Sequence, residues 1–191
     1  MIATARRPPF PAFATAAAAV VAAVALAAVP ACGSAVVDHT PAGNLLDADT
    51  QSIEGGIGHW HAWFSTEVVR TTDDPHRGHA SLHIVVTAPN GWGVELDNWP
   101  GFSAAPGDHH FDLWARIASG SALDLEVAIR WRNDAGDELQ TDTLRARPSD
   151  AWQSIAGDVT APTGTTRVAL ELTGSEAGPG DAIDIDEIFL L

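Results

Sequence analysis

Two tryptophans and two acidic residues share one short stretch of the sequence, residues 90–99, which reads NGWGVELDNW. Its alternation of apolar and polar residues predicts a β-strand with Glu95 and Asp97 on the polar face. Burying two indoles and two carboxylates on one short strand would be costly, because charged groups lose their hydration. The stretch therefore predicts an exposed surface where flat rings lie beside hydrogen-bonding acids.

A sugar ring is a ligand that suits such a surface. An indole presents apolar area with little conformational entropy to lose, so it can cover the C–H face of a pyranose. Carboxylates and guanidinium groups can pair with the hydroxyls around the ring. Residues 110–117 form a second predicted strand, whose polar face carries Trp114 and Arg116. We expect both to face Glu95 across the same sheet.

The orientation of the two indoles in NGWGVELDNW depends on whether the strand is regular. Strict alternation places Trp92 in the core and Trp99 on the polar face with Glu95. A β-bulge at Gly91 or Gly93 would instead turn Trp92 toward the ligand. Both remain candidates for a sugar platform. Trp131 is a third candidate, since its phase favours the core while its place at a strand end allows ligand contact.

The charge balance argues against two classes of partner. The chain has 25 acidic residues against 10 basic ones, all of them arginine, and a net charge of −15. Such a chain should repel nucleic acid and anionic membrane surfaces. We therefore expect no nucleic-acid partner and no membrane contact apart from a lipid anchor.

The N-terminus predicts export. Arg6 and Arg7 precede an uncharged, alanine-rich run that ends at Cys32, the only cysteine in the chain. The pattern predicts a secretory signal over residues 1–31 and resembles a bacterial lipoprotein signal, in which Cys32 would carry the lipid. The alternative is an uncleaved transmembrane anchor. Residues 32–43 would form the lipidated cysteine and a tether, and the protein would lie in the cell envelope, outside the cytoplasm.

The remaining residues, 44–191, predict one all-β domain. Turn signals such as DDPHRG, NDAGD and EAGPG recur at short intervals, and the segments between them alternate with period two. In residues 123–131, for example, Leu123, Leu125, Val127, Ile129 and Trp131 share one face. About ten short strands with glycine- and proline-rich turns favour a β-sandwich.

The order of the motifs adds a family resemblance. NLLDADTQSIEGGIGHW, TTDDPHRGHASLHI, GWGVEL, APGDHHFDLWARIASGS, IRWRNDAGDEL, AWQSIAGDVTAPTGTTRVALELTG and AIDIDEIFLL follow one another. Together they resemble carbohydrate-binding modules of the family 4, 9 and 22 type. The resemblance implies a galactose-binding-domain-like jelly roll of two antiparallel sheets, with a glycan cleft on the concave sheet. It also implies that Trp92 and Glu95 contact the sugar, and that Trp60, Trp63 and Trp152 are structural residues, which we expect in the core.

The same resemblance implies a structural calcium ion. Glu54 and Asp186 stand at the matching acidic positions, and Asp73 or Asp74 could supply a further oxygen. Calcium needs six to eight oxygen ligands. We therefore expect Glu54, Asp186 and Asp74 to lie close together.

Non-catalytic binding of a polysaccharide is the function that these observations favour. A protein-interaction or structural role at the cell envelope is the main alternative. A glycosidase would need two carboxylates at a defined separation, and the sequence contains neither G-x-S-x-G, H-E-x-x-H nor a phosphate-binding loop. We therefore expect no enzyme activity.

Overall fold

The computed structural model describes residues 41–191, except residues 90, 97–98 and 121–122. The predicted signal segment, Cys32, most of the tether and Asp97 lie outside the described residues. Within the described part, no helix is long and apolar enough to cross a bilayer.

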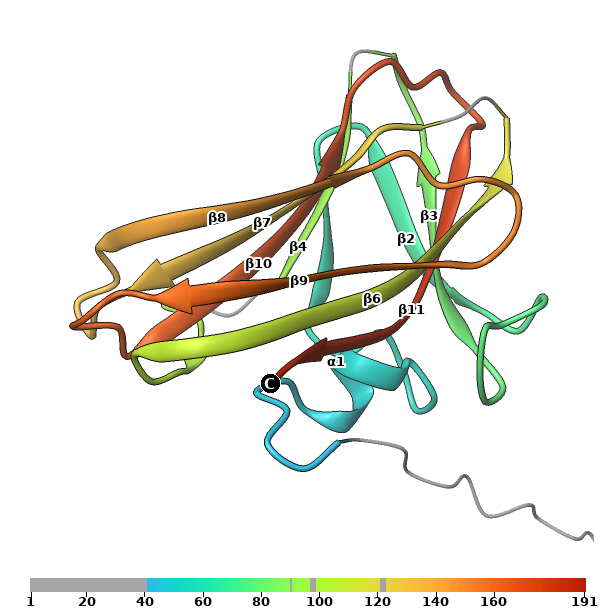
Figure 1. Cartoon of the computed structure of the whole chain (residues 1–191). Coiled ribbons are helices and arrows are strands. Elements are labelled where there is room, and N and C mark those ends of the chain that lie inside the picture. The colour runs from blue at the N-terminus through green and yellow to red at the C-terminus, as the bar shows by residue number, and fades with distance from the viewer. Residues whose placement is uncertain (1–40, 90, 97–98, 121–122) are drawn as a thin grey trace, which may run out of the picture. The chain divides into compact units, whose positions relative to one another are not determined.

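Two antiparallel sheets form the domain (Figure 1). Sheet A has the order β1-β4-β10-β7-β8, and β5 pairs with β10. Its strands are β1 (Trp60–Trp63), β4 (Trp92–Leu96), β5 (Phe102–Ser103), β7 (Leu125–Arg132), β8 (Glu138–Ala146) and β10 (Arg167–Gly174). Sheet B has the order β2-β3-β11-β6-β9. Its strands are β2 (Thr66–Thr71), β3 (Ser81–Val86), β6 (Gly107–Ser119), β9 (Gln153–Ala161) and β11 (Ala182–Leu190).

One short helix, α1 (Ala48–Ser52), lies beside the end of β11 (Figure 1). Asp47 caps its N-terminus, because its carboxylate accepts a hydrogen bond of 2.9 Å from the backbone N–H of Thr50. The helix ends at Ile53, whose φ of 60° lies in the left-handed region. Asp47 and Ile53 thus define both ends of an element that the period-two sequence pattern did not predict.

The core lies between the two sheets and consists mainly of the inward-facing apolar side chains of their strands. On β7, Leu125, Val127, Ile129 and Trp131 are all buried, as the alternation predicts. Trp60, Trp92 and Trp131 are the largest fully buried side chains. The prediction of an all-β sandwich of two antiparallel sheets is therefore confirmed.

The pairing of β4 decides which way Trp92 faces. β4 pairs with both of its neighbours, β1 and β10, without a register shift. Leu96 of β4 lies opposite Trp60 of β1, and Trp92 of β4 lies opposite Gly174 of β10. No bulge interrupts the strand, so Trp92 points into the core with 1% of its surface exposed. Glu95 consequently lies on the outer face. The strand is therefore regular and has no bulge at Gly93, and the expected placement of Trp92 at a ligand surface is wrong.

Trp92→Ala tests this assignment through stability. Removing a fully buried indole should lower the free energy of unfolding by about 3–5 kcal/mol, because it leaves a cavity in the core. Trp99→Ala is the matched control: that side chain is 71% exposed, so its loss should cost no more than about 0.5 kcal/mol. Urea unfolding of both variants measures the difference. Equal midpoints for the two variants would contradict a core position for Trp92.

Candidate functional site

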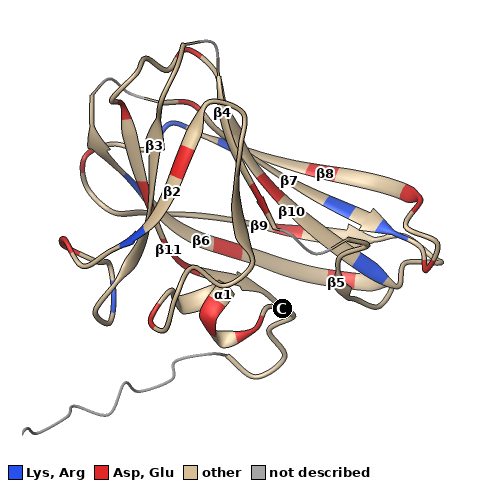
Figure 2. Cartoon of the chain, turned by 180° about the vertical axis from the view of Figure 1, so that it is seen from behind, with Lys and Arg blue, Asp and Glu red and all other residues tan. Residues whose placement is uncertain are grey.

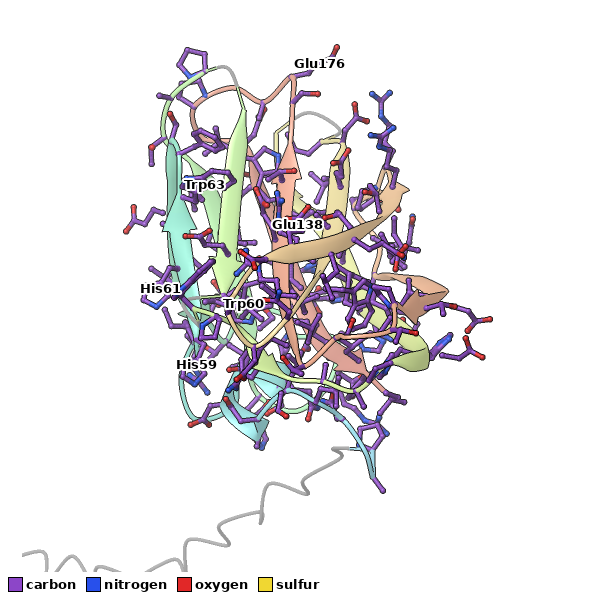
Figure 3. All side chains as sticks on the ribbon, turned by 90° about the vertical axis from the view of Figure 1, so that its left-hand side faces the viewer. His59, Trp60, His61, Trp63, Glu138 and Glu176 are labelled. Atoms are coloured by element: carbon purple, nitrogen blue, oxygen red, sulfur yellow. The ribbon has the colours of Figure 1, made fainter. Side chains whose placement is uncertain are left out.

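The outer face of sheet A carries polar side chains between two exposed aromatic groups. Trp99 lies at one end, and its ring covers the guanidinium of Arg132 at 4.7 Å. Trp63 lies at the other end, on β1 (Figure 3), where the register aligns it with Gly93, Thr173 and Glu126 on successive strands. Glu126 and Arg132 are six residues apart on β7, or about 20 Å of extended strand. The face is therefore long enough for several sugar rings.

A hollow of about 140 Å³ lies beside Trp99 on this face. Its lining consists of Glu95, Leu96, Trp99, Arg130, Arg132, Ala169, Leu170 and Glu171. Ala169 is the small residue between these larger side chains, since it follows the outward phase of β10 and lies opposite Arg130 in the register. The hollow thus combines an exposed ring, two guanidinium groups and two carboxylates.

Ion pairs hold the polar groups of the hollow in place. Arg130 donates a hydrogen bond of 2.9 Å from Nε to Glu171 and one of 3.0 Å from Nη1 to Glu138. Hydrogen bonds from Thr141 and from Arg130 hold the pKa of Glu138 below its usual value. Glu95 is exposed and lies directly opposite Glu171 in the register. This face can therefore offer fixed donors and acceptors to sugar hydroxyls.

Trp63 and Phe64 form a second exposed aromatic surface. Their rings stack with centroids 4.1 Å apart, and the side chains are 37% and 66% exposed. Phe64 has a φ of 54°, which is unfavourable for a bulky residue and is often associated with function. A Cβ at Gly93 would lie 3.4 Å from both rings, so glycine lets the rings approach the sheet closely.

Sequence reasoning assigned Trp63 to the core, and this assignment is wrong. The signal that could have found it is its spacing. Trp60 and Trp63 are three residues apart on one strand, and residues an odd number apart face opposite sides. Because Trp60 is fully buried, Trp63 has to point outward.

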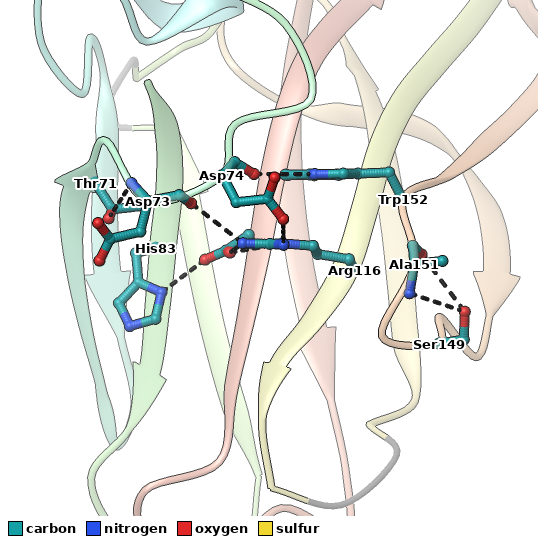
Figure 4. A network of polar contacts seen from close by, with 9 residues as sticks. Thr71, Asp73, Asp74, His83, Arg116, Ser149, Ala151 and Trp152 are labelled. Atoms are coloured by element: carbon teal, nitrogen blue, oxygen red, sulfur yellow. Dashed lines mark hydrogen bonds and ion pairs between the residues drawn. The ribbon is translucent and has the colours of Figure 1, made fainter. Parts of the chain in front are cut away.

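Trp114 and Arg116 belong to β6, on the other sheet, so their expected position beside Glu95 is wrong. Nε and Nη2 of Arg116 donate to Asp184 at 3.0 and 2.9 Å, and Nη1 contacts the carboxylate of Asp74 (Figure 4). Trp114 stacks on His76 at 3.8 Å. Alternation predicted correctly that both face outward, but it contains no information about which sheet a strand joins.

The structure decides between the two positions left open for Trp131 and corrects the position expected for Trp152. Trp131 is fully buried and donates from its indole N–H to Asp142 at 2.7 Å, so it is part of the core and not of the ligand surface. Trp152, expected in the core, lies on the sheet B side, where its ring faces the guanidinium of Arg116 at 5.1 Å. Its indole N–H donates to the carbonyl of Asp74.

Two of the three predicted calcium ligands converge on one segment. Glu54 accepts hydrogen bonds from the backbone N–H groups of His79 and Ala80, and Asp186 accepts one from Arg77. Asp74 instead pairs with Arg116, so its expected place in this cluster is wrong. In the described part of the chain, no group of three or more acidic, histidine or cysteine side chains is arranged to hold a metal ion.

Comparisons with known proteins identify the fold. No family model and no curated protein matches the chain. Among solved structures, the CBM22-1 xylan-binding domain of Paenibacillus barcinonensis Xyn10C matches with a TM-score of 0.60 and 22% identity, over 77% of this chain and 92% of that domain. TmCBM61, solved with β-1,4-galactotriose, matches with a TM-score of 0.55 and 15% identity, over 78% and 97%.

A larger protein also contains this fold. The CBM22-1–GH10 part of Clostridium thermocellum xylanase 10B, complexed with xylohexaose, matches with a TM-score of 0.60 and 9% identity. The match covers 73% of this chain but only 27% of that one. The described domain therefore has the jelly-roll fold of carbohydrate-binding modules, as its motif order led us to expect.

Asp186 predicts a pH-dependent stability. Burial raises the pKa of its carboxyl to about 7, although backbone N–H groups oppose the shift. A carboxyl whose pKa is higher in the folded state contributes stability that is fully present below the unfolded pKa of about 4 and is lost as the pH rises to about 7. In chelator, the melting temperature of Asp186→Asn should therefore fall less over this range than that of the wild type. Glu67→Gln, which removes an exposed carboxylate, is the control. Parallel curves for wild type and Asp186→Asn would contradict the assignment.

Proposed function

We propose that the domain binds a polysaccharide chain without cleaving it, on the outer face of sheet A. The observation that carries the proposal is the hollow beside Trp99, where an exposed indole lies next to Glu95, Arg130 and Glu171. Trp99 would cover the apolar face of one sugar ring. Glu95 and the Arg130–Glu171 pair would exchange hydrogen bonds with its hydroxyls.

The second aromatic group extends the site along the chain of sugars. Trp63 and Phe64 would contact sugar rings beyond the hollow, about 20 Å from the Trp99 end. Two separated platforms favour a polymer over a single sugar, because a monosaccharide can reach only one of them. A xylan or another β-linked glycan suits this open face. The names of solved structures of this fold, one a xylan-binding domain and one a complex with β-1,4-galactotriose, support that class.

The N-terminal segment supports a second proposal, that the protein is a secreted lipoprotein anchored through Cys32. The apolar run before Cys32 and the lipoprotein-like sequence around it are the basis for this. The anchor would hold the glycan-binding face at the cell envelope.

We also propose a structural calcium ion near the segment that contains Arg77 and His79. Glu54 and Asp186 are the side chains that would hold it, since both already contact this segment from distant parts of the sequence. A cation there would offset the cost of burying the Asp186 carboxylate. Asp74 has no part in this site.

Binding is tested by affinity electrophoresis in gels that contain xylan or β-glucan. Trp99→Ala should weaken retention about thirtyfold, because burial of a ring against a sugar is worth about 2 kcal/mol. Trp63→Ala should weaken it too, and Glu95→Gln less, because the amide still accepts a hydrogen bond. Trp152→Ala, on the opposite face, is the control. If no glycan retains the wild type, a protein-interaction role replaces this proposal, and a pull-down with the immobilised domain follows.

Anchoring is tested by cell fractionation of Cys32→Ala. The variant should leave the membrane fraction or keep an uncleaved signal, because no lipid can be attached. Ser34→Ala, two residues away, should fractionate as the wild type does. A processed Cys32→Ala protein that stays in the membrane fraction would contradict lipidation.

Calcium is tested by the melting temperature with calcium and with chelator. A ligand that binds only the folded state raises the melting temperature by mass action. Glu54→Ala should abolish that rise, whereas Asp74→Ala should preserve it. A wild-type melting temperature that responds to neither calcium nor chelator would remove the site.

A further inference from the structure

Two arginines lie side by side at the Trp99 end of the outer face. Arg132 on β7 and Arg167 on β10 are direct cross-strand partners, and both follow the outward phase of their strands. Like charges in this position destabilise a sheet. Figure 2 shows basic residues gathered where β7 ends and β10 begins, beside β5. The pair lies at the Trp99 end of the candidate binding surface, where Arg132 lines the hollow.

Other arginines near sheet A have close acidic partners. Arg130 pairs with Glu171 and Glu138, Arg145 pairs with Glu126 at 2.8 Å, and Arg147 pairs with Asp124 at 2.7 Å. Each of these guanidinium groups therefore already has a carboxylate of the protein as its ion-pair partner.

The Arg132–Arg167 pair is compensated less closely. Glu138 lies opposite Arg132 on β8 and its pKa is lowered partly by Arg132, but its carboxylate forms its ion pair with Arg130. Arg167 reaches only Asp134, at 3.8 Å, and the side chain of Asp134 is 84% exposed. Its Nε is buried without a hydrogen-bond partner. Arg132 lies against the ring of Trp99 and, within the described residues, is within ion-pair distance of no carboxylate. Arg132 thus lines the hollow, Arg167 lies beside it on the neighbouring strand, and in the described part of the chain neither guanidinium has a carboxylate closer than 3.8 Å.

We propose that Arg132 and Arg167 recognise a carboxylate on the bound glycan, so that the preferred ligand carries hexuronic acid residues. This inference rests on the proposed glycan-binding function and specifies the ligand of the same site. A guanidinium presents two parallel N–H donors that match the two oxygens of a carboxylate. Trp99 lies against the guanidinium of Arg132 and offers its exposed surface to the sugar ring that carries the acid.

The acidic charge of the whole chain does not prevent this. The net charge is −15, but charges separated by more than about 8 Å are largely screened at physiological ionic strength. The hollow is lined by Arg130 and Arg132 and also by Glu95 and Glu171, and Arg130 is already paired with Glu171. The arginines that remain for a glycan carboxylate are Arg132, which lines the hollow, and its cross-strand partner Arg167. Local charge therefore decides which glycans bind.

A matched pair of polymers tests the inference: a glucuronoxylan, and the same glucuronoxylan after chemical reduction of its carboxyl groups to hydroxymethyl groups. The backbone is identical in both, so any difference in affinity is due to the carboxylates. By isothermal titration calorimetry, the wild type should bind the reduced polymer about tenfold more weakly. The difference should shrink as salt rises from about 0.01 M to about 1 M, because the Debye length falls from about 30 Å to about 3 Å.

Variants assign the effect to the two arginines. Arg132→Gln and Arg167→Gln should bind both polymers with the affinity that the wild type has for the reduced one. Their melting temperatures should equal or exceed that of the wild type, because each change relieves a like-charge contact. Arg132→Lys should keep part of the preference, since it retains the charge but not the paired donors. Arg147→Gln changes the net charge equally and should leave the preference intact.

Three outcomes are decisive. Equal wild-type affinity for the two polymers would overturn the carboxylate site and leave glycan binding in place. A preference that survives in Arg132→Gln and Arg167→Gln would place the carboxylate elsewhere and overturn the assignment. If the wild type binds neither of the two polymers and no neutral glycan, the proposed function itself is overturned.

Discussion

The burial of Trp60, Trp92 and Trp131 between the sheets fixes the registers on which the outer face of sheet A depends. Because side chains alternate along a strand, each buried indole determines the facing of its neighbours. Because Trp92 is buried, Glu95 lies on the outer face of the sheet. Because Trp131 is buried, Arg130 and Arg132 also lie on that face. A slip of one residue would exchange the core with the candidate binding surface, so the packing energy of these rings also maintains the geometry of the site.

The two outer faces differ in how their charges are used. On sheet B, Arg116 is 14% exposed and its guanidinium contacts Asp74 and Asp184, while Nδ1 of His83 lies 2.6 Å from Asp184 (Figure 4). Such a network orders the segment containing Asp73 and Asp74 against the sheet. On sheet A, Arg132 lies beside the exposed ring of Trp99, and among the described residues neither Arg132 nor its cross-strand partner Arg167 has a carboxylate closer than 3.8 Å. A surface with guanidinium groups that lack a close carboxylate is the one suited to a polar ligand.

The sequence predicted what depends on local periodicity. The alternation in residues 123–131 identified the buried face of β7, and the motif order identified the jelly roll. Local periodicity could not assign β4 and β6 to different sheets, and this is why Trp114 and Arg116 were expected beside Glu95. Nor could it show that Asp74 pairs with Arg116, since these residues are 42 positions apart. The outward position of Trp63 was available from its odd spacing to Trp60, but family resemblance outweighed it.

The central claim is that glycans bind to the outer face of sheet A, and the indole N–H signals of the seven tryptophans test it most directly. In an NMR titration of the ¹⁵N-labelled domain with a glucuronoxylan oligosaccharide, each signal reports on its own position. Binding on the outer face of sheet A should shift the signals of Trp99 and Trp63 and leave those of Trp114 and Trp152, on the opposite face, unchanged. Shifts confined to Trp114 and Trp152 would place the binding site on sheet B and exclude binding on sheet A.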